Sequence, residues 1–258
     1  MNSPIKWGDL GAVAEHYVSR PPYAAVALDV LSSFILARRP GAVVADIGAG
    51  TGKLTGMLAQ RELHGYAIEP SKGMSAQRPA FGPAVERFEW KVGSAEETGL
   101  PDASVDWVCM GTAFHWTDHR HALKEFKRIL RPGGYFTAIW DLNDPNDDSL
   151  MTEIEAEIER RIAGLQRVQN TIYKLFGQIE MVLTETRGFG DCFSIAMPHS
   201  EAMTPATYLD MWKSYHDVPS QIGSERWGEL LNLIADRVAG KAEVITHYRT
   251  HAWTVRSI

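Results

Sequence analysis

Short apolar runs alternate with amphipathic stretches over the first 140 residues of the chain. The runs have the length of buried strands and occupy residues 42–47, 65–68, 88–92, 105–110 and 135–140. Between them, apolar residues recur at helical spacing. In residues 119–130, for example, Ala122, Leu123 and Phe126 share one face. Strands separated by helices indicate βαβ crossovers, and we therefore predict a doubly wound α/β fold with a mostly parallel sheet.

The pattern changes after residue 140. A polar, turn-rich stretch at residues 143–148 precedes three helical patterns, which lie at 150–162, 205–215 and 224–238. Residues 244–255 then alternate in hydrophobicity as a strand does. We predict three parts from these patterns. Residues 1–140 form an N-terminal lid segment and the α/β core, residues 141–243 form a helical cap that includes a sheet strand, and residues 244–258 form the closing strand of the core sheet.

The composition argues against several classes of protein. The chain has 26 Lys and Arg against 32 Asp and Glu, a net charge of −6, and no basic block. We therefore expect no nucleic-acid partner. No apolar stretch approaches the roughly 20 residues of a membrane span, so we expect a cytoplasmic protein without a membrane partner. Cys109 and Cys192 lie in apolar stretches with no CxxC pattern and are expected to be reduced, buried thiols.

A glycine cluster follows directly after the first apolar run. Residues 44–52 read VADIGAGTG, and a helical pattern begins after them. Ligands of open α/β sheets bind at the carboxyl ends of the strands, and glycines let a ligand approach the backbone there. Lys53 stands where a dinucleotide fingerprint has its third glycine, and no P-loop spacing is present. With Asp46 just before the loop, the site suits a nucleoside without phosphates.

An acid ends the second predicted strand. Glu69 lies about 20 residues past the glycine cluster, which is the position that binds ribose hydroxyls in such sheets. A carboxylate there accepts two hydrogen bonds. The alternative is a solvated acid at the end of a strand.

Four motifs in this order resemble those of class I S-adenosylmethionine-dependent methyltransferases. They are residues 46–52 (DIGAGTG), residues 69–74 (EPSKGM), residues 93–96 (GSAE) and residues 130–134 (LRPGG). The resemblance covers about residues 40 to 140. It implies a seven-stranded, Rossmann-like sheet with a helical cap, S-adenosylmethionine as cofactor and S-adenosylhomocysteine as product.

The resemblance also implies roles for single residues. Gly48 and Gly50 would let the backbone approach the methionine and ribose portions, and Glu69 would hold both ribose hydroxyls. Ser94 stands where the family often has Asp, and its hydroxyl would accept from the adenine amino group more weakly than a carboxylate. The predicted cofactor-binding residues are Tyr17, Arg20, Asp46, Gly48, Ala49, Gly50, Glu69, Pro70, Met74, Ser94, Ala95, Glu96 and Thr112.

Two further segments resemble the type 11 subgroup, which includes trans-aconitate methyltransferase-like proteins. They are residues 113–116 (AFHW), after the fourth strand, and residues 17–23 (YVSRPPY). The resemblance places the first beside the transferred methyl group and folds the second over the cofactor. His115 is the candidate general base, because imidazole titrates near working pH. The alternative is a packed imidazole that only shapes the pocket. Asp118 is predicted to cap the helix that follows.

We expect a small-molecule acceptor between these two segments and the cap. Its candidate contacts are Tyr23, Phe114, Trp116, Trp140 and Trp212. Trp212 belongs to a stripe with Tyr208, Met211 and Tyr215 on one helical face. This stripe either packs on the sheet domain or contacts a partly apolar or planar substrate.

Two other functions stay open at this point. A non-catalytic protein that binds S-adenosylmethionine would keep the same glycine loop. An NAD-dependent oxidoreductase shares the loop and the ribose acid but lacks the third glycine. No metal site is expected, since His115 and His119 share a helical face only if the helix began before Asp118. The substrate, the accepting atom and the oligomeric state, a homodimer included, are not predicted.

Overall fold

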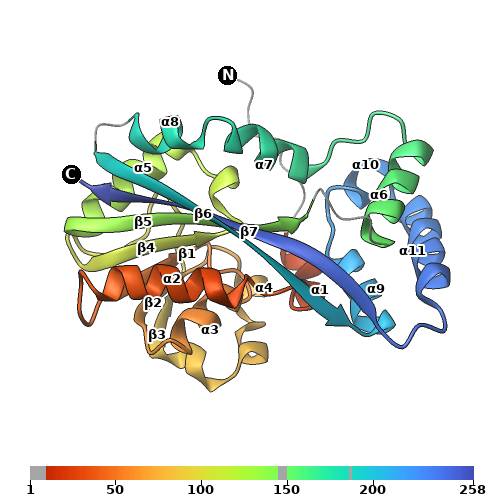
Figure 1. Cartoon of the computed structure of the whole chain (residues 1–258), viewed down its shortest axis with the longest axis horizontal. Coiled ribbons are helices and arrows are strands. Elements are labelled where there is room, and N and C mark those ends of the chain that lie inside the picture. Colours follow the sequence, from red (N-terminus) through yellow and green to blue (C-terminus); the bar gives the residue numbers. More distant parts are fainter. Residues whose placement is uncertain (1–9, 145–149, 186–187) are drawn as a thin grey trace.

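One seven-stranded sheet organises the molecule. The computed structural model describes residues 10–144, 150–185 and 188–258, so most of the polar stretch predicted at 143–148 lies outside the described residues. The strands run in the order β3-β2-β1-β4-β5-β7-β6 (Figure 1). Their bounds are β1 (Val43–Ile47), β2 (His64–Ile68), β3 (Phe88–Lys91), β4 (Val105–Gly111), β5 (Leu130–Asn143), β6 (Phe189–Met203) and β7 (Val244–Ser257).

The first five strands are parallel, and β7 is antiparallel to both of its neighbours. Strand β1 pairs with β2 from Val43 opposite His64 to Ile47 opposite Ile68, so the two strands end side by side. Strand β7 enters between β5 and β6, and its pairing with β6 reaches Val244 opposite Met203. The predicted doubly wound, mostly parallel seven-stranded sheet is confirmed, and so is the closing strand.

Helices cover both faces of the sheet (Figure 1). On one face lie α2 (Ala25–Leu36) and α3 (Lys53–Ala59), whose apolar residues pack with Val44, Trp107 and Ile139. The other face carries α5 (His119–Ile129), α7 (Val168–Phe176) and α8 (Ile179–Thr184), packed on Val108, Phe136 and Ala138. Because alternate residues of a strand point to opposite faces, neighbouring residues such as Trp107 and Val108 pack against the helices on opposite sides of the sheet.

A second group of helices forms the cap. It contains α6 (Leu150–Arg161), α9 (Pro205–Lys213), α10 (Pro219–Ile222) and α11 (Ser224–Val238), which have their own apolar core around Ile154, Trp212 and Ile234. Figure 1 shows β6 and β7 running out of the sheet into this group. Short helices complete the chain: η1 (Leu10–Val13), α1 (Ala14–Tyr17), α4 (Lys72–Ser75), η2 (Arg78–Phe81), η3 (Pro83–Arg87) and η4 (Phe114–Trp116).

Residues 141–243, predicted as the cap, divide between the two bodies. Helices α7 and α8 and the first part of β6 belong to the core, where Ile172, Leu183 and Phe189 are buried with the sheet residues. Helices α6, α9, α10 and α11 form the cap proper. Both cysteines are free; Cys109 is buried, and Cys192 is half-buried rather than buried as expected.

Candidate active site

The predicted cofactor residues meet at the carboxyl ends of β1, β2 and β4, around a cavity of about 270 Å³. We call it the glycine-loop cavity. Of the predicted residues, those that line it are Tyr17, Asp46, Gly48, Ala49, Gly50, Glu69, Pro70, Met74, Ser94, Ala95, Glu96 and Thr112. Tyr23 and Trp116, predicted for the substrate, line it as well. Residues from five separate segments therefore converge as the sequence predicts.

The glycine loop takes a backbone conformation that other residues rarely adopt. Gly48 and Gly50 have φ values of +69° and +58°, and a Cβ on Gly48 would lie 2.9 Å from the Cβ of Ala113. The amides of Gly48 and Ala49 both donate to the carbonyl of Ile68, at 2.8 and 3.0 Å. The loop is thus tied to the end of β2, and glycine at position 48 leaves the cavity wall flat.

Glu69 is held by the backbone on both sides of its carboxylate. The Gly50 amide donates to Oε2 at 2.7 Å, and the Ser71 amide donates to Oε1 at 2.8 Å. Burial raises the pKa of Glu69, while these two hydrogen bonds lower it. Each carboxylate oxygen accepts about two hydrogen bonds, so each has capacity left on the cavity side. This arrangement suits a vicinal pair of ribose hydroxyls.

Asp46 lies beneath the loop with one oxygen unpartnered. The Thr55 hydroxyl donates to Oδ2 at 2.5 Å, whereas the buried Oδ1 has no hydrogen-bond partner among the described residues. Burial raises the pKa of this carboxyl to about 7. A buried polar atom without a partner costs free energy, and a cationic ligand group in the cavity would remove that cost.

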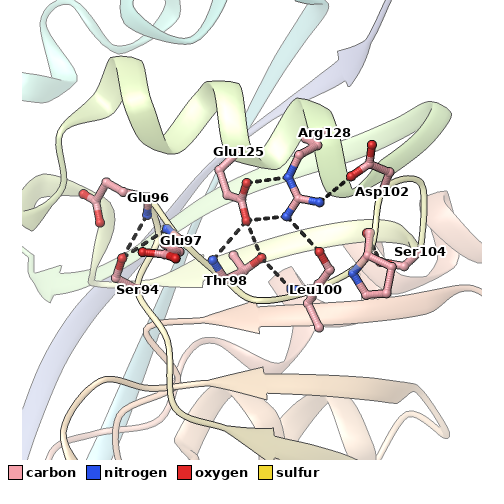
Figure 2. A network of polar contacts seen from close by, with 10 residues as sticks. Ser94, Glu96, Glu97, Thr98, Leu100, Asp102, Ser104, Glu125 and Arg128 are labelled. Atoms are coloured by element: carbon pink, nitrogen blue, oxygen red, sulfur yellow. Dashed lines mark hydrogen bonds and ion pairs between the residues drawn. The ribbon is translucent and has the colours of Figure 1, made fainter.

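A polar network holds the loop after β3 against α5 (Figure 2). Glu125 accepts from the amide and the hydroxyl of Thr98, at 3.0 and 2.6 Å. Arg128 donates to both oxygens of Glu125 and to the carbonyl of Leu100. Asp102 also pairs with Arg128 at 2.5 Å. The network anchors the segment that follows the cavity-lining residues Ser94, Ala95 and Glu96.

The role predicted for Ser94 changes in this structure. Its hydroxyl oxygen accepts from the amides of Glu96 and Glu97, each at 3.2 Å (Figure 2). The acceptor capacity of Ser94 is therefore used within its own turn, and an adenine amino group would have to find another acceptor. Glu96 also lines the cavity, and one of its oxygens accepts from the Asp118 amide at 2.9 Å.

A second cavity of about 120 Å³ lies between the core and the cap. We call it the cap cavity. Both cavities are lined by Tyr17, Tyr23, Lys53, Thr112 and Trp116, so they meet at these five residues. Thr112 has φ +51°, unusual for a residue other than glycine, and its hydroxyl lies 3.2 Å from the hydroxyl of Tyr23.

Lys53 ties the N-terminal segment to this junction. Its ammonium group donates to the carbonyls of Arg20 and Pro21, the latter at 3.0 Å. Burial, followed by the positive charge of Arg20, lowers the pKa of Lys53 to about 7. The sequence prediction used Lys53 only to exclude a dinucleotide-binding loop. Its position directly after the glycine loop was the one sequence feature that could have indicated a place in the site.

Arg20 lines the cap cavity rather than the glycine-loop cavity, which corrects its prediction as a cofactor residue. Its Nε donates to the Ser214 hydroxyl at 2.8 Å. The guanidinium stacks between Tyr17 and Tyr215, 4.5 and 4.9 Å from the ring centroids. These contacts to Tyr215 and Ser214, just past α9, turn the side chain toward the cap.

His115 lines the cap cavity, with one ring nitrogen already engaged. The Trp140 indole N–H, which can only donate, points at Nδ1 over 3.2 Å. Nδ1 is therefore the accepting nitrogen, and Nε2 carries the proton. Burial lowers the pKa of His115 to about 3, with His119 and His216 adding to the shift. The ring can donate from Nε2, but it has no free lone pair for a proton, which argues against a general base.

Three aromatic residues predicted to contact the substrate line neither cavity, and this part of the prediction is corrected. Phe114 is fully buried and stacks on His119 with the ring centroids 4.4 Å apart. Trp140 faces the helical layer of α7 and contacts Phe176. Trp212 lies in the core of the cap. Of the predicted stripe, Met211 and Tyr215 reach the cap cavity, while Tyr208 and Trp212 pack in the core of the cap.

Other residues of the cap cavity were not predicted. Asp141 lies at its wall and accepts from the Thr250 hydroxyl at 2.6 Å; its carboxylate also lies 2.8 Å from His199. Arg167 and His216 also line the cavity. Nothing in their local sequence marks them, because they come together only when the cap docks.

Two further observations bear on the sequence predictions. Asp118 caps α5, accepting from the amides of Arg120 and His121, as predicted. Within the described residues, no group of three or more His, Cys, Asp or Glu side chains has the arrangement of a metal site. Nor does any described helix have the length and apolarity to cross a membrane.

Comparison with known proteins agrees with this geometry. A family model described as "Methyltransferase domain" matches residues 45–138, the segment with β1 to β5 and most of the glycine-loop cavity. An uncharacterized methyltransferase-like protein of Schizosaccharomyces pombe is 30% identical over 250 residues, which cover 94% of this chain and 92% of that protein. The chain belongs to the class I S-adenosylmethionine-dependent methyltransferases.

Other relatives share a smaller part. Uncharacterized methyltransferases of Mycobacterium tuberculosis and Mycobacterium bovis are 40% identical over 133 residues, 52% of this chain. The chain spans about half of the length of these relatives (51%). A solved structure of a proposed methyltransferase from Anaeromyxobacter dehalogenans shares the fold at 23% identity, with a TM-score of 0.58 and coverage of 92% of this chain and 96% of that one. A second, from Anabaena variabilis, has a TM-score of 0.56 at 23% identity, over 92% and 98% of the two chains.

This membership identifies the ligand for which the glycine-loop cavity is built. S-adenosylmethionine is the cofactor of the family. Membership therefore favours methyl transfer over the nicotinamide-dependent reaction, which the glycine loop alone does not exclude. The lining residues fit this cofactor: each carboxylate oxygen of Glu69 has capacity for a further hydrogen bond, and the buried Oδ1 of Asp46 has no partner among the described residues.

Proposed function

We propose that this protein transfers a methyl group from S-adenosylmethionine to a small molecule bound in the cap cavity. One observation carries the proposal: the two cavities meet at Tyr17, Tyr23, Lys53, Thr112 and Trp116. A cofactor held against the glycine loop would present its methyl group at this junction, and an acceptor in the cap cavity would approach it from the opposite side.

The residues of the glycine-loop cavity would hold the cofactor. Gly48 and Gly50 allow close approach of the backbone, Glu69 would bind the ribose hydroxyls, and Asp46 would face the amino group of the methionine portion. Two carboxylates in one cavity also suit a ligand with positive charge. When bound, the cofactor supplies a methyl group on a positively charged sulfur, which a nucleophile displaces in line.

The protein's main contribution at the junction is alignment. Methyl transfer needs the nucleophile about 3–3.5 Å from the methyl carbon and in line with the bond that breaks. Tyr23 and Thr112 are fixed to one another there, and Lys53 holds the N-terminal segment in place over them. Closure of this segment also excludes water from a reaction in which charge is neutralised.

Label transfer tests the proposal. The protein is incubated with methyl-labelled S-adenosylmethionine and the low-molecular-weight fraction of a cell extract, and labelled products are separated and analysed by mass. We expect label in one small molecule or a few related ones. Binding of S-adenosylhomocysteine in calorimetry without any label transfer would identify a non-catalytic binding protein. Label transfer only to protein or nucleic acid of the high-molecular-weight fraction, in a parallel incubation, would contradict the small-molecule acceptor.

A further inference from the structure

One side chain of the cap cavity has all of its hydrogen-bonding capacity unused. His216 lies just past α9 and lines the cavity opposite Trp116, with the two ring centroids 5.7 Å apart. Both of its ring nitrogens are buried, and neither has a hydrogen-bond partner among the described residues. Buried polar groups in folded proteins nearly always have partners, so this imidazole requires an explanation.

Its charge state follows from its surroundings. Burial, and then the positive charge of Arg20, lowers the pKa of His216 to about 4; Asp217 acts weakly in the opposite direction. The ring is therefore neutral near pH 7, with one N–H to donate and one lone pair to accept. A phenyl ring of similar shape would fill the same space without leaving any polar atom unsatisfied.

The carboxylates and the other imidazole of the cavity have partners within the protein. Asp217 accepts from the Arg167 guanidinium at 3.0 Å and from the Val168 amide at 3.1 Å. Asp141 accepts from Thr250 and pairs with His199, and His115 accepts from Trp140. Arg20 is bound to Ser214 and has no carboxylate partner among the described residues.

We propose that His216 binds the methyl acceptor, through a hydrogen bond to an oxygen function of that molecule beside the guanidinium of Arg20. This inference rests on the proposed function, since it takes the cap cavity as the acceptor site. Both residues line the cavity, and Arg20 is close enough for its positive charge to act on the imidazole. Together they would orient the acceptor with its nucleophile toward the junction at Thr112 and Trp116. His216 acts here as a positioning residue that touches the substrate.

The test compares His216→Phe and His216→Asn with the unchanged protein. Three quantities are measured: the affinity for S-adenosylhomocysteine by calorimetry, the melting temperature, and the initial rate of label transfer at increasing concentrations of the same extract fraction. His64 is exposed on β2, outside both cavities, and His64→Phe is the matched control.

We expect His216→Phe to bind S-adenosylhomocysteine within twofold of the unchanged protein. Its melting temperature should be equal or higher, because an unsatisfied polar ring is replaced by an apolar one. Its half-saturating extract concentration should rise about tenfold or more, the range for loss of one buried hydrogen bond. His216→Asn should recover part of this loss, because an amide also donates and accepts. His64→Phe should change none of the three.

A lower melting temperature of His216→Phe would show that the ring has a structural partner in the protein, and it would overturn the inference. An unchanged half-saturating concentration with normal label transfer would overturn the role of His216 alone. Absence of label transfer from the unchanged protein would instead overturn the proposed function, and the inference with it.

Discussion

Removal of the Glu69 carboxylate is the most direct test of the cofactor site. Glu69 receives one backbone hydrogen bond on each oxygen, from Gly50 at 2.7 Å and from Ser71 at 2.8 Å. Glu69 lines the glycine-loop cavity, and each of its oxygens has capacity for a further hydrogen bond. Glu69→Ala removes the acceptor for the ribose hydroxyls and leaves the two amides exposed to water in the cavity.

The size of the effect follows from the number of hydrogen bonds. A hydrogen bond to a charged group contributes about 1.5–3 kcal/mol. Two such bonds are not additive, because water replaces them in part and the variant no longer has to desolvate a buried carboxylate. We therefore expect the loss of about one bond, roughly a 10- to 160-fold weaker affinity for S-adenosylhomocysteine.

Calorimetric titration near pH 7.5 measures this loss. Glu89→Ala is the matched control, since Glu89 is exposed on β3 and, among the residues that the structure describes, pairs only with Lys91 on the same strand. A second titration uses an S-adenosylhomocysteine analogue without the 2′-hydroxyl. The unchanged protein should discriminate against this analogue, and Glu69→Ala should not. An affinity of Glu69→Ala within twofold of the unchanged protein, or equal discrimination in both proteins, would refute the assigned role.

Four further predictions follow from charges in and around the site. The affinity for S-adenosylhomocysteine should fall as the pH drops from 8 to 6, because burial places the pKa of Asp46 at about 7 and its charge is lost below that pH; calorimetry across pH should show no such slope in Asp46→Asn. Glu125→Ala should lower the free energy of unfolding by about 1–3 kcal/mol, measured in urea, and should weaken cofactor binding, since Thr98 loses its anchor. His115→Asn should keep most label transfer between pH 6.5 and 8, because an amide oxygen can accept the Trp140 N–H; a loss above 100-fold that shrinks as pH rises would restore the general base. The folded pKa of His115 lies far below the unfolded value of 6.5, so its contribution to stability is present above pH 6.5 and is lost as the pH falls toward 3. Denaturation at pH 5 and 7.5 should show a smaller difference in His115→Asn than in the unchanged protein.

The core of the fold and the cofactor half of the site could be predicted because both depend on residues within short, continuous segments of the sequence. Buried parallel strands form continuous apolar runs, so β1 and β4 were found within one residue of their observed ends. Asp46 and Glu69 end neighbouring parallel strands, and the topology alone brings their side chains to one edge. Their placement could be predicted without knowing any contact between distant segments of the chain.

Strand β6 could not be located from the sequence for a physical reason. It lies at the edge of the sheet and is mostly half-exposed or exposed, so it lacks the continuous apolar run of a central strand. Pro198 within it is typical of edge strands, which need not donate a hydrogen bond on their outer side. Helices α7 and α8 were missed with it, because they pack on the sheet beside this strand.

The aromatic residues show a different limit. Phe114 is next in sequence to His115, and Trp140 is next to Asp141, both of which line the cap cavity, but the side chains of Phe114 and Trp140 pack in the layer of α5 and α7. Strand alternation decides the face of Trp140, and a one-residue difference in register would reverse it. Proximity in sequence therefore predicted the loop after β4 and strand β5 as parts of the site, but it selected Phe114 and Trp140, whose side chains do not line it.

The acceptor half of the site depends on contacts between distant segments. Arg20 precedes the matched methyltransferase segment, and Arg167, Tyr215 and His216 follow it. The segment from 45 to 138 carries most of the residues that line the glycine-loop cavity, whereas the residues that would select an acceptor come from the N-terminal segment and the cap. Relatives that share only about half of this chain therefore inform the cofactor site and leave the acceptor open. We propose that the acceptor is selected in the cap cavity, where the imidazole of His216 has no hydrogen-bond partner among the described residues.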